Sequence, residues 1–369
     1  KINPKNSAIY GNLGVIFKIK GDINRAIKCY IEAIKLDPKN IPIYNNLANA
    51  FKEIKNYKMA LQVYADILKI NPNDFNIYNN IGIVFELIGE NNKAIEAYKQ
   101  AVRVNPNYAK AVNNIAVVLY KQKRYKESAQ IFEIALQTDP NYFEVYSNKG
   151  AAYNKAKDYD KAIESLEMAI LKMPNHGGAY TNLGNVYNKL HDYEKASKLH
   201  EKSIELEPNG SNAYSNLGTS YKYLGLSNKA ISSYKKAIEL DPNFVNAHFD
   251  LATMYLAMED FENGWKEYEW RFKKDEMIPH IIRHKDIFSK PLFTGAEDIK
   301  GKILLLHSEQ GYGDSIQFIR FLPQIKEKFG CKIAVKCREG LKELFQTMSE
   351  IDEIADRNEA TPQFDFQLS

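Results

Sequence analysis

The stretch Ser7–Asn40 reads SAIYGNLGVIFKIKGDINRAIKCYIEAIKLDPKN and holds one full copy of a pattern that recurs along the chain. In its first half, four residues have the i, i+3, i+4, i+7 spacing of one helix face: Tyr10, Leu13, Gly14 and Phe17. In its second half, a further helix face is formed by Ala26, Tyr30 and Ala33. Gly21 and Asp22 predict a turn between the halves, and Pro38 ends the second helix because it lacks a backbone N–H. The unit is therefore predicted to be a helix pair.

The pattern repeats with a constant period of 34 residues. The period is marked by Pro4, Pro38, Pro72, Pro106, Pro140, Pro174, Pro208 and Pro242. A constant period of this length predicts a repeat array. Seven full units occupy 7–244, and 245–272 is predicted to be a degenerate capping unit. Residues 1–6 are interpreted as the tail of a truncated unit, since the letters of Lys1–Pro4 recur at Lys69–Pro72, and we expect further repeats before it.

The succession of an aromatic residue, Leu-Gly, an aromatic residue, Ala, an aromatic residue, Ala and Pro resembles the tetratricopeptide-repeat (TPR) family. The resemblance covers about two thirds of the chain and implies an all-α superhelical solenoid. In such a solenoid the first helix of each pair lines a concave groove. The resemblance thus implies that the groove binds a protein or an extended peptide.

One polar position recurs in the first helix of every full unit. We call it the asparagine column: Asn12, Asn46, Asn80, Asn114, Asn148, Asn182 and Asn216. Asparagine is a mediocre residue for a helix interior, and this position lies two residues after the first core aromatic, so its side chain should point away from the partner helix. An amide presents a donor and an acceptor side by side, which complements a peptide backbone. The column therefore predicts a peptide-binding groove, and it resembles the asparagine ladder of O-GlcNAc transferases.

Two other interpretations of this column can be weighed. The repeats could have kept asparagine from one ancestral unit without a role in binding. A clamp for a C-terminal carboxylate, as in chaperone-binding TPR proteins, needs Lys and Arg. The position before the column holds no basic residue, being Gly11, Asn45, Asn79, Asn113, Ser147, Thr181 and Ser215. We therefore do not expect a carboxylate clamp.

Composition excludes several classes of function. The formal net charge is +4, with Lys and Glu interspersed, so we do not expect nucleic-acid binding. No apolar run approaches the length of a membrane span. The three cysteines Cys29, Cys331 and Cys337 are too few and too far apart to suggest a disulfide framework, which fits a reducing cytoplasm. His280 and His284 have i, i+4 spacing, but no carboxylate motif accompanies them and we expect no metal site.

The character of the chain changes after the repeats. Residues 273–300 are predicted to be a linker. Beyond it, short apolar runs predict strands at 302–307, 332–335, 351–355 and 364–368, separated by helices at 315–329 and 338–348. This alternation predicts a parallel sheet, and 301–369 is interpreted as the incomplete first lobe of a Rossmann-like α/β domain.

The loop Glu309–Asp314 joins the first strand to the following helix, where ligands gather in open α/β sheets. Gly311 and Gly313 allow close backbone approach, but the third glycine of the dinucleotide fingerprint is missing, so we do not expect NAD. Asp314 is a candidate for catalysis. It also fits a purely structural role, as a helix-capping pair with Gln317.

From Pro291 to Arg320, and above all in Gly301–Leu306 and Glu309–Arg320, the chain resembles bacterial TPR–glycosyltransferase fusions with a heptosyltransferase-like, GT-B catalytic part. The resemblance implies Asp314 as candidate general base. It also implies an acceptor loop formed by Glu309, Gln310, Gly311, Gly313 and Arg320. The donor substrate would be a nucleotide sugar, held mainly by a second lobe.

These observations lead to one leading hypothesis and one alternative. In the leading hypothesis, the TPR groove presents a protein acceptor to a glycosyltransferase in the full-length protein. We expect this chain to be an inactive fragment without a cofactor of its own, because the predicted first lobe is incomplete. The alternative is a non-catalytic interaction scaffold whose C-terminal domain is degenerate.

Overall fold

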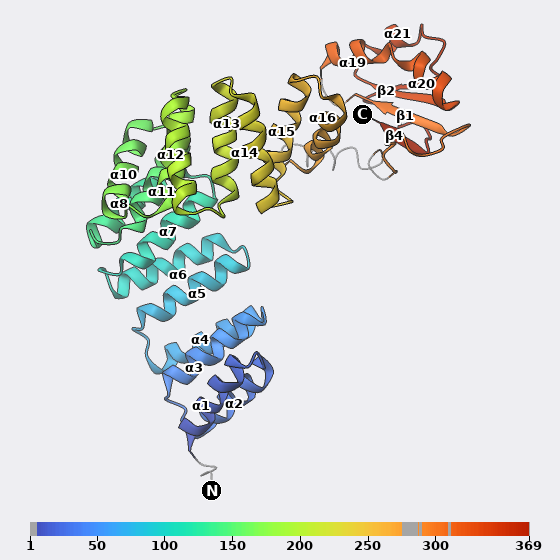
Figure 1. Cartoon of the computed structure of the whole chain (residues 1–369). Helices are drawn as coiled ribbons and strands as arrows, with labels where there is room; N and C mark the ends of the chain where they lie inside the picture. Colours follow the sequence, from blue (N-terminus) through green and yellow to red (C-terminus); the bar gives the residue numbers. More distant parts are fainter. Residues whose placement is uncertain (1–5, 275–286, 288–289, 309–310, 369) are drawn as a thin grey trace. The chain divides into compact units, whose positions relative to one another are not determined.

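A computed structural model of the chain describes residues 6–274, 287, 290–308 and 311–368. The chain forms two compact units, Lys1–Met254 and Tyr255–Ser369. The first is helical, and the second contains a small parallel sheet (Figure 1). Among the described residues, no helix combines the length and apolar character that crossing a bilayer requires.

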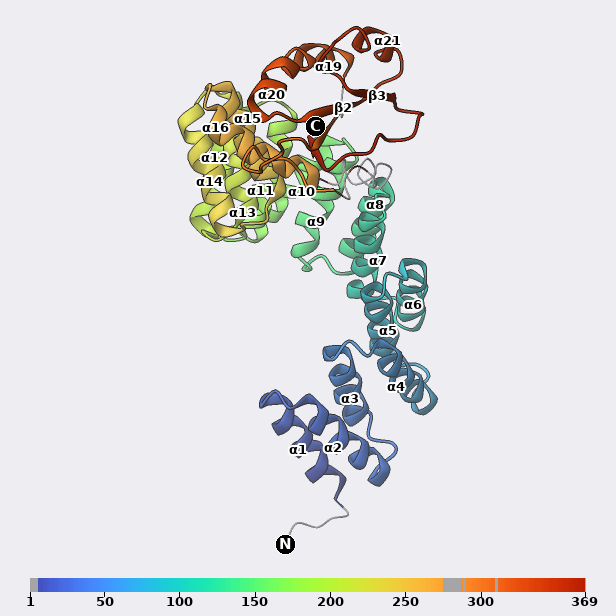
Figure 2. The same ribbon diagram turned by 90° about the vertical axis from the view of Figure 1, so that its right-hand side faces the viewer.

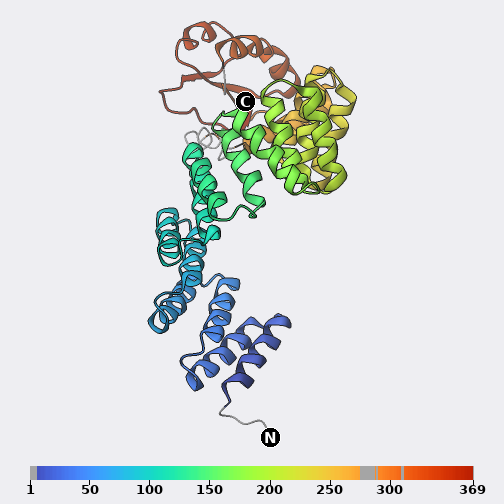
Figure 3. The same cartoon turned by 90° about the vertical axis from the view of Figure 1, so that its left-hand side faces the viewer.

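Helices follow one another through the first unit with short connections. Their bounds are α1 Ser7–Ile19, α2 Ile23–Leu36, α3 Ile41–Glu53, α4 Tyr57–Ile70, α5 Phe75–Leu87, α6 Asn91–Val104, α7 Ala109–Lys121, α8 Tyr125–Thr138, α9 Glu144–Lys155, α10 Tyr159–Lys172, α11 Gly177–Lys189, α12 Tyr193–Leu206, α13 Ser211–Tyr223, α14 Ser227–Leu240 and α15 Val245–Ala257. Each odd-numbered helix up to α13 packs on the next even-numbered one, and each such pair contacts the following pair (Figures 2 and 3). The predicted succession of helix pairs is confirmed.

The core of each pair is built on close contact between a small residue and a large one. A Cβ atom added to Gly82 would lie 2.4 Å from the ring of Tyr98, and one added to Gly14 would lie 2.5 Å from the ring of Tyr30. Both tyrosine side chains are fully buried. Glycine thus lets the two helices approach, and the aromatic ring fills the space between them.

The turn inside each pair uses a left-handed residue. After α1, the backbone N–H of Gly21 donates to Lys18 O and that of Asp22 donates to Phe17 O, both at 2.9 Å, which is a Schellman motif. Asp22 then caps α2, since its side chain accepts from the N–H of Arg25 at 3.0 Å. Glycine holds the left-handed position at 21, 89 and 225, whereas lysine holds it at 55, 123 and 157.

In the second unit, α16 (Phe261–Tyr268) and a 3₁₀ helix (Glu269–Lys273) precede the sheet. The strands are β1 Ile303–His307, β2 Lys332–Cys337, β3 Glu353–Asp356 and β4 Phe366–Leu368, and the helices between them are α19 Tyr312–Ile319, α20 Leu322–Phe329 and α21 Lys342–Phe345. All pairings are parallel and the strand order is β3-β2-β1-β4. The four strands predicted from the apolar runs and their parallel pairing are therefore confirmed.

The sheet is buried on both faces. On one face Leu304, Ile333 and Val335 pack with Leu322 of α20 and Phe345 of α21. On the other face Leu305 and Ala334 pack with Ile287 and Phe364. Burial on both faces explains why β1 and β2 appear as continuous apolar runs in the sequence.

Several predicted details of this unit were wrong. The single helix expected over 315–329 is two helices, because Pro323 has no N–H to continue the ladder. The helix expected over 338–348 shrinks to Lys342–Phe345. Part of the predicted linker 273–300 also belongs to the core, since Phe293 and Ile299 are buried and Leu292 forms a parallel bridge with Gln367.

Candidate functional site

The asparagine column lies on the first helices of the pairs, outside their cores. Its members occupy α1, α3, α5, α7, α9, α11 and α13, one on each helix. Asn12 and Asn148 are exposed, and the other five are half-buried. Their side chains therefore keep access to solvent while they stand on rigid helices. This is the placement that a ladder for a bound chain requires.

Two members of the column are tied to the preceding repeat. Asn114 Nδ2 donates to Asn79 Oδ1 at 2.9 Å, and Asn182 Nδ2 donates to Ser147 Oγ at 3.2 Å. By contrast, Asn12, Asn46, Asn80, Asn148 and Asn216 make no side-chain hydrogen bond within the residues that the structure describes. The column is therefore divided into amides that already have a partner and amides that do not.

The position before each column residue forms a second polar row, which we call the flanking row. It consists of Gly11, Asn45, Asn79, Asn113, Ser147, Thr181 and Ser215. Asn79 and Ser147 are almost fully buried, at 2% and 3% exposure. In the sequence the row is conspicuous only for its lack of basic residues. Its signal was present, because a run of small polar residues at one helical position is unusual beside an apolar core.

The flanking row is a structural layer with incomplete hydrogen bonding. Asn113 Nδ2 donates to Asn114 Oδ1 at 3.4 Å. Asn45 Oδ1 and Asn113 Oδ1 are buried and have no partner among the described residues. A buried amide is held in a fixed orientation when it is hydrogen-bonded. Without a hydrogen-bond partner, it lowers the free energy of unfolding. At Asn79 and Ser147 the row ties the first helices of neighbouring repeats together.

The candidate acceptor loop is only partly described. Glu309 and Gln310 lie outside the described residues. Gly311 precedes α19 with a φ of +23°, and Gly313 and Asp314 belong to the first turn of α19. Asp314 is exposed, beyond the carboxyl end of β1. Ser308 Oγ and Ser315 Oγ lie 2.8 Å apart and join the end of β1 to this turn.

One prediction about the loop is corrected by this geometry. The capping pair is wrong, because Gly311 is the N-cap residue and Asp314 already lies inside the helix. Arg320 follows the last residue of α19 and its guanidinium lies 5.0 Å from the ring of Phe321. Arg320 lies six positions after Asp314, about 9 Å further along the chain axis, and its place in an acceptor loop stays a prediction. Within the described residues, no group of His, Cys, Asp and Glu side chains is arranged to hold a metal ion.

Comparison with known proteins identifies the helical part. The family profile of the cilia and flagella-associated protein 70 C-terminal domain, a TPR profile, matches residues 4–216, more than half of the chain. Profiles of the tetratricopeptide repeat match residues 211–244 and 233–267. The chain belongs to this TPR family. These profiles end before β1, so the glycosyltransferase resemblance stays a prediction. No curated protein matches the chain.

Solved structures agree on the fold of this TPR protein. A tetratricopeptide repeat protein from Parabacteroides merdae ATCC 43184 is 19% identical, with a TM-score of 0.54, and the match covers 67% of this chain and 98% of that one. The APC/C hetero-tetramer Cut9-Hcn1 is 16% identical with the same TM-score of 0.54, over 72% of this chain and 51% of that one. MamA is 27% identical over 46% of this chain and 92% of its own, at a TM-score of 0.40. The first two likenesses establish the helical repeat fold.

Proposed function

We propose that the TPR unit is a protein-interaction scaffold that binds an extended segment of another protein along the asparagine column. The observation that carries the proposal is the column itself: one amide per repeat, each on the first helix and each with access to solvent. The 34-residue period places these amides at one equivalent point of every unit. An extended chain offers N–H and C=O groups all along its length, so a column of amides can bind it at several points.

The five column amides without a described partner are the strongest contact candidates. Asn46, Asn80 and Asn148 can donate and accept at once without first breaking a hydrogen bond. Asn114 and Asn182 are already bonded to the preceding repeat, so we assign these two residues a structural role between repeats. Because an amide reads the backbone and not the side chains, we propose that the groove tolerates many peptide sequences.

The test is a binding measurement on peptides selected against the whole chain from a random 15-residue library. We expect Asn46→Ala, Asn80→Ala and Asn148→Ala together to weaken binding by about a hundredfold, from about 1 kcal/mol for each lost hydrogen bond. The matched control replaces three exposed asparagines of second helices: Asn24→Ala, Asn92→Ala and Asn228→Ala. Equal dissociation constants for the two triple variants, or a library that yields no binding peptide, would reject the groove.

We further propose that the C-terminal unit is the first lobe of a glycosyltransferase to which the TPR unit delivers its protein. The proposal is supported by the parallel order β3-β2-β1-β4 and by the exposed carboxylate of Asp314 at the carboxyl end of β1. A carboxylate at this edge can accept a proton from an acceptor hydroxyl while a nucleotide sugar, as donor substrate, supplies the glycosyl group. The alternative of a plain interaction scaffold needs only the first unit.

Transfer of labelled sugar to a peptide-tagged acceptor by the full-length protein tests this second proposal. Asp314→Asn keeps the size of the side chain and removes its basicity, and we expect activity to fall by about a hundredfold or more. Asp298→Asn, on the loop before β1, is the control and should leave transfer unchanged. Full activity of the Asp314→Asn variant would show that Asp314 is not the general base. An absence of sugar transfer by the unaltered protein would favour the alternative of a non-catalytic interaction scaffold.

A further inference from the structure

A pocket lies where the strands of the sheet end. It is lined by Ile287, His307, Ser308, Lys336, Cys337, Arg338 and Arg357 and is open to solvent on one side. His307 is the last residue of β1 and Cys337 the last of β2, so the pocket sits at the carboxyl edge of the parallel sheet. We call it the basic pocket, because Lys336, Arg338 and Arg357 bring three cationic side chains to it.

Arg338 places a buried hydrogen-bond donor without a described partner at the basic pocket. Its Nε atom is buried and has no hydrogen-bond partner among the described residues. Its guanidinium lies 5.4 Å from the centre of the Tyr312 ring, which restricts its orientation. A buried donor without a partner is costly, and such groups in native proteins call for an explanation such as an absent ion.

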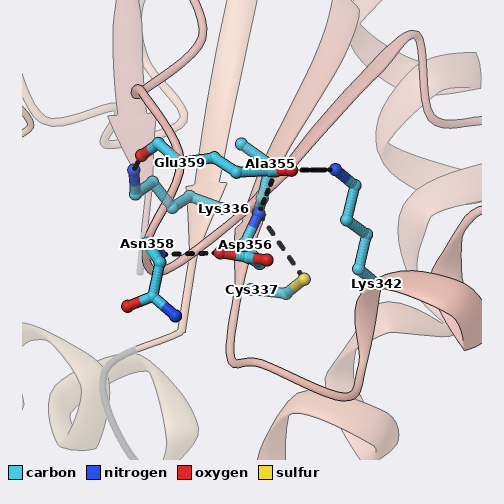
Figure 4. Close-up of polar contacts among 7 residues, drawn as sticks. All are labelled: Lys336, Cys337, Lys342, Ala355, Asp356, Asn358 and Glu359. Carbon is cyan, nitrogen blue, oxygen red and sulfur yellow. Dashed lines mark hydrogen bonds and ion pairs between the residues drawn. The ribbon is translucent and has the colours of Figure 1, made fainter.

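The turn after β3 determines which groups contact the amino group of Lys336 (Figure 4). Lys342 Nζ donates to Glu359 Oε2 at 2.6 Å, and the backbone N–H of Asp356 donates to the same carboxylate at 2.8 Å. Lys342 thereby holds the pKa of Glu359 below its usual range. Since this carboxylate is already engaged, Lys336 Nζ donates only to the carbonyl oxygen of Glu359, at 2.6 Å.

Arg357 lies inside this fixed turn. The backbone N–H of Asn358 donates to Asp356 Oδ1 at 2.7 Å and closes the turn on its other side (Figure 4). Within the described part of the chain, no ion pair neutralises Lys336, Arg338 or Arg357. Three cationic side chains therefore meet at one edge of the sheet, and that of Lys336 is largely withdrawn from solvent.

We propose that the basic pocket binds the phosphoryl group of a small phosphorylated ligand. A carboxylate is matched by a single bidentate arginine, whereas a phosphoryl group accepts from several donors and carries up to two charges. The carboxyl edge of a parallel sheet is where α/β proteins bind phosphorylated ligands. The Ser308 hydroxyl, on the pocket wall, adds a neutral donor. Asp314 lies in the neighbouring first turn of α19 but does not line the pocket.

This inference goes beyond the peptide-binding role, because the basic pocket lies wholly in the second unit. Titration calorimetry of the whole chain with inorganic pyrophosphate tests it. We expect Arg338→Gln with Arg357→Gln to weaken binding by about tenfold or more. The matched control is Lys302→Gln with Lys332→Gln, which removes the same charge from exposed residues at the opposite, amino edge of the sheet. This control should leave the affinity within about twofold.

Two further measurements keep the outcome clear. Arg357 is exposed, so Arg357→Gln alone should fold normally and still weaken binding several-fold, which separates loss of a contact from loss of the fold. Succinate should bind more weakly than pyrophosphate if the pocket selects a phosphoryl group. Equal losses in the pocket variant and the amino-edge control would show a general charge effect and overturn the proposal. An absence of pyrophosphate binding by the unaltered chain would overturn it as well.

Discussion

At the scale of single residues, His200 is the most consequential departure from the repeat. It stands where other units have Tyr30, Tyr64, Tyr98 and Tyr234, and it is fully buried against Gly184. Its Nε2 lies 3.3 Å from Asn188 Nδ2, and its Nδ1 is buried with no partner among the described residues. Burial lowers the pKa of His200 from 6.5 to about 4. The imidazole is therefore neutral in the folded protein at neutral pH.

This burial predicts a pH-dependent stability. The full stability is present above pH 6.5, where the ring is neutral in both states. It is lost as the pH falls from 6.5 towards 4, because the unfolded chain then binds a proton that the folded chain excludes. The loss approaches about 3 kcal/mol. We expect His200→Tyr to flatten this dependence in denaturant unfolding at pH 7.5 and pH 4.5. The same loss between these two pH values in both proteins would contradict it.

At the scale of the element, the left-handed residue inside each helix pair predicts an asymmetry between repeats. Lys123 and Lys157 have φ values of +62° and +65°, a conformation that costs a residue with a Cβ atom about 1 kcal/mol. Lys123→Gly and Lys157→Gly should each raise the free energy of unfolding by about that amount. Conversely, Gly89→Ala, at φ +80° in an open position, should lower it. Chemical denaturation measures all three, and destabilisation by both lysine changes would refute the explanation.

Helices and strands were largely predictable because their signals are local. The 34-residue period and the i, i+3, i+4, i+7 faces identify the helix pairs. The apolar runs identify β1 and β2, because both faces of the sheet are buried. The break of the helix at Pro323 was also readable in principle, since proline is a local signal. The late start of α21 had a local signal as well, Gly340 with a φ of +84°, whereas its end at Phe345 had none.

Features made by distant segments could not be predicted in this way. The flanking row is buried only because first helices of successive repeats stack, as the bond between Asn114 and Asn79 shows. The basic pocket needs Arg338 from the end of β2 and Arg357 from the turn after β3 to meet. No sequence motif links Asn79 to Asn114 or Arg338 to Arg357. The asparagine column is predictable from the sequence because the same residue recurs every 34 positions. The basic pocket is not predictable, because its residues come from separate segments and occur once each.

At the scale of the whole molecule, the repeat architecture spreads both stability and binding over many equivalent units. Each repeat contacts only its neighbours, so a substitution in one unit acts mainly on that unit and on its two interfaces. Binding along the asparagine column should follow the same rule. We therefore expect each unpartnered column residue to contribute a similar, modest amount to binding. Asp314 and the basic pocket belong to the second unit, so their proposed roles are independent of peptide binding along the column.

The central claim is that the asparagine column holds the backbone of an extended peptide. Its most direct test is the dissociation constant of one selected peptide, measured by fluorescence anisotropy before and after N-methylation of alternate backbone amides. N-methylation removes backbone donors and leaves every side chain in place. We predict that it weakens binding by about tenfold or more for each contacted amide, with little further loss when Asn46, Asn80 and Asn148 are already alanine. An affinity that is unchanged by N-methylation at every position would contradict the claim.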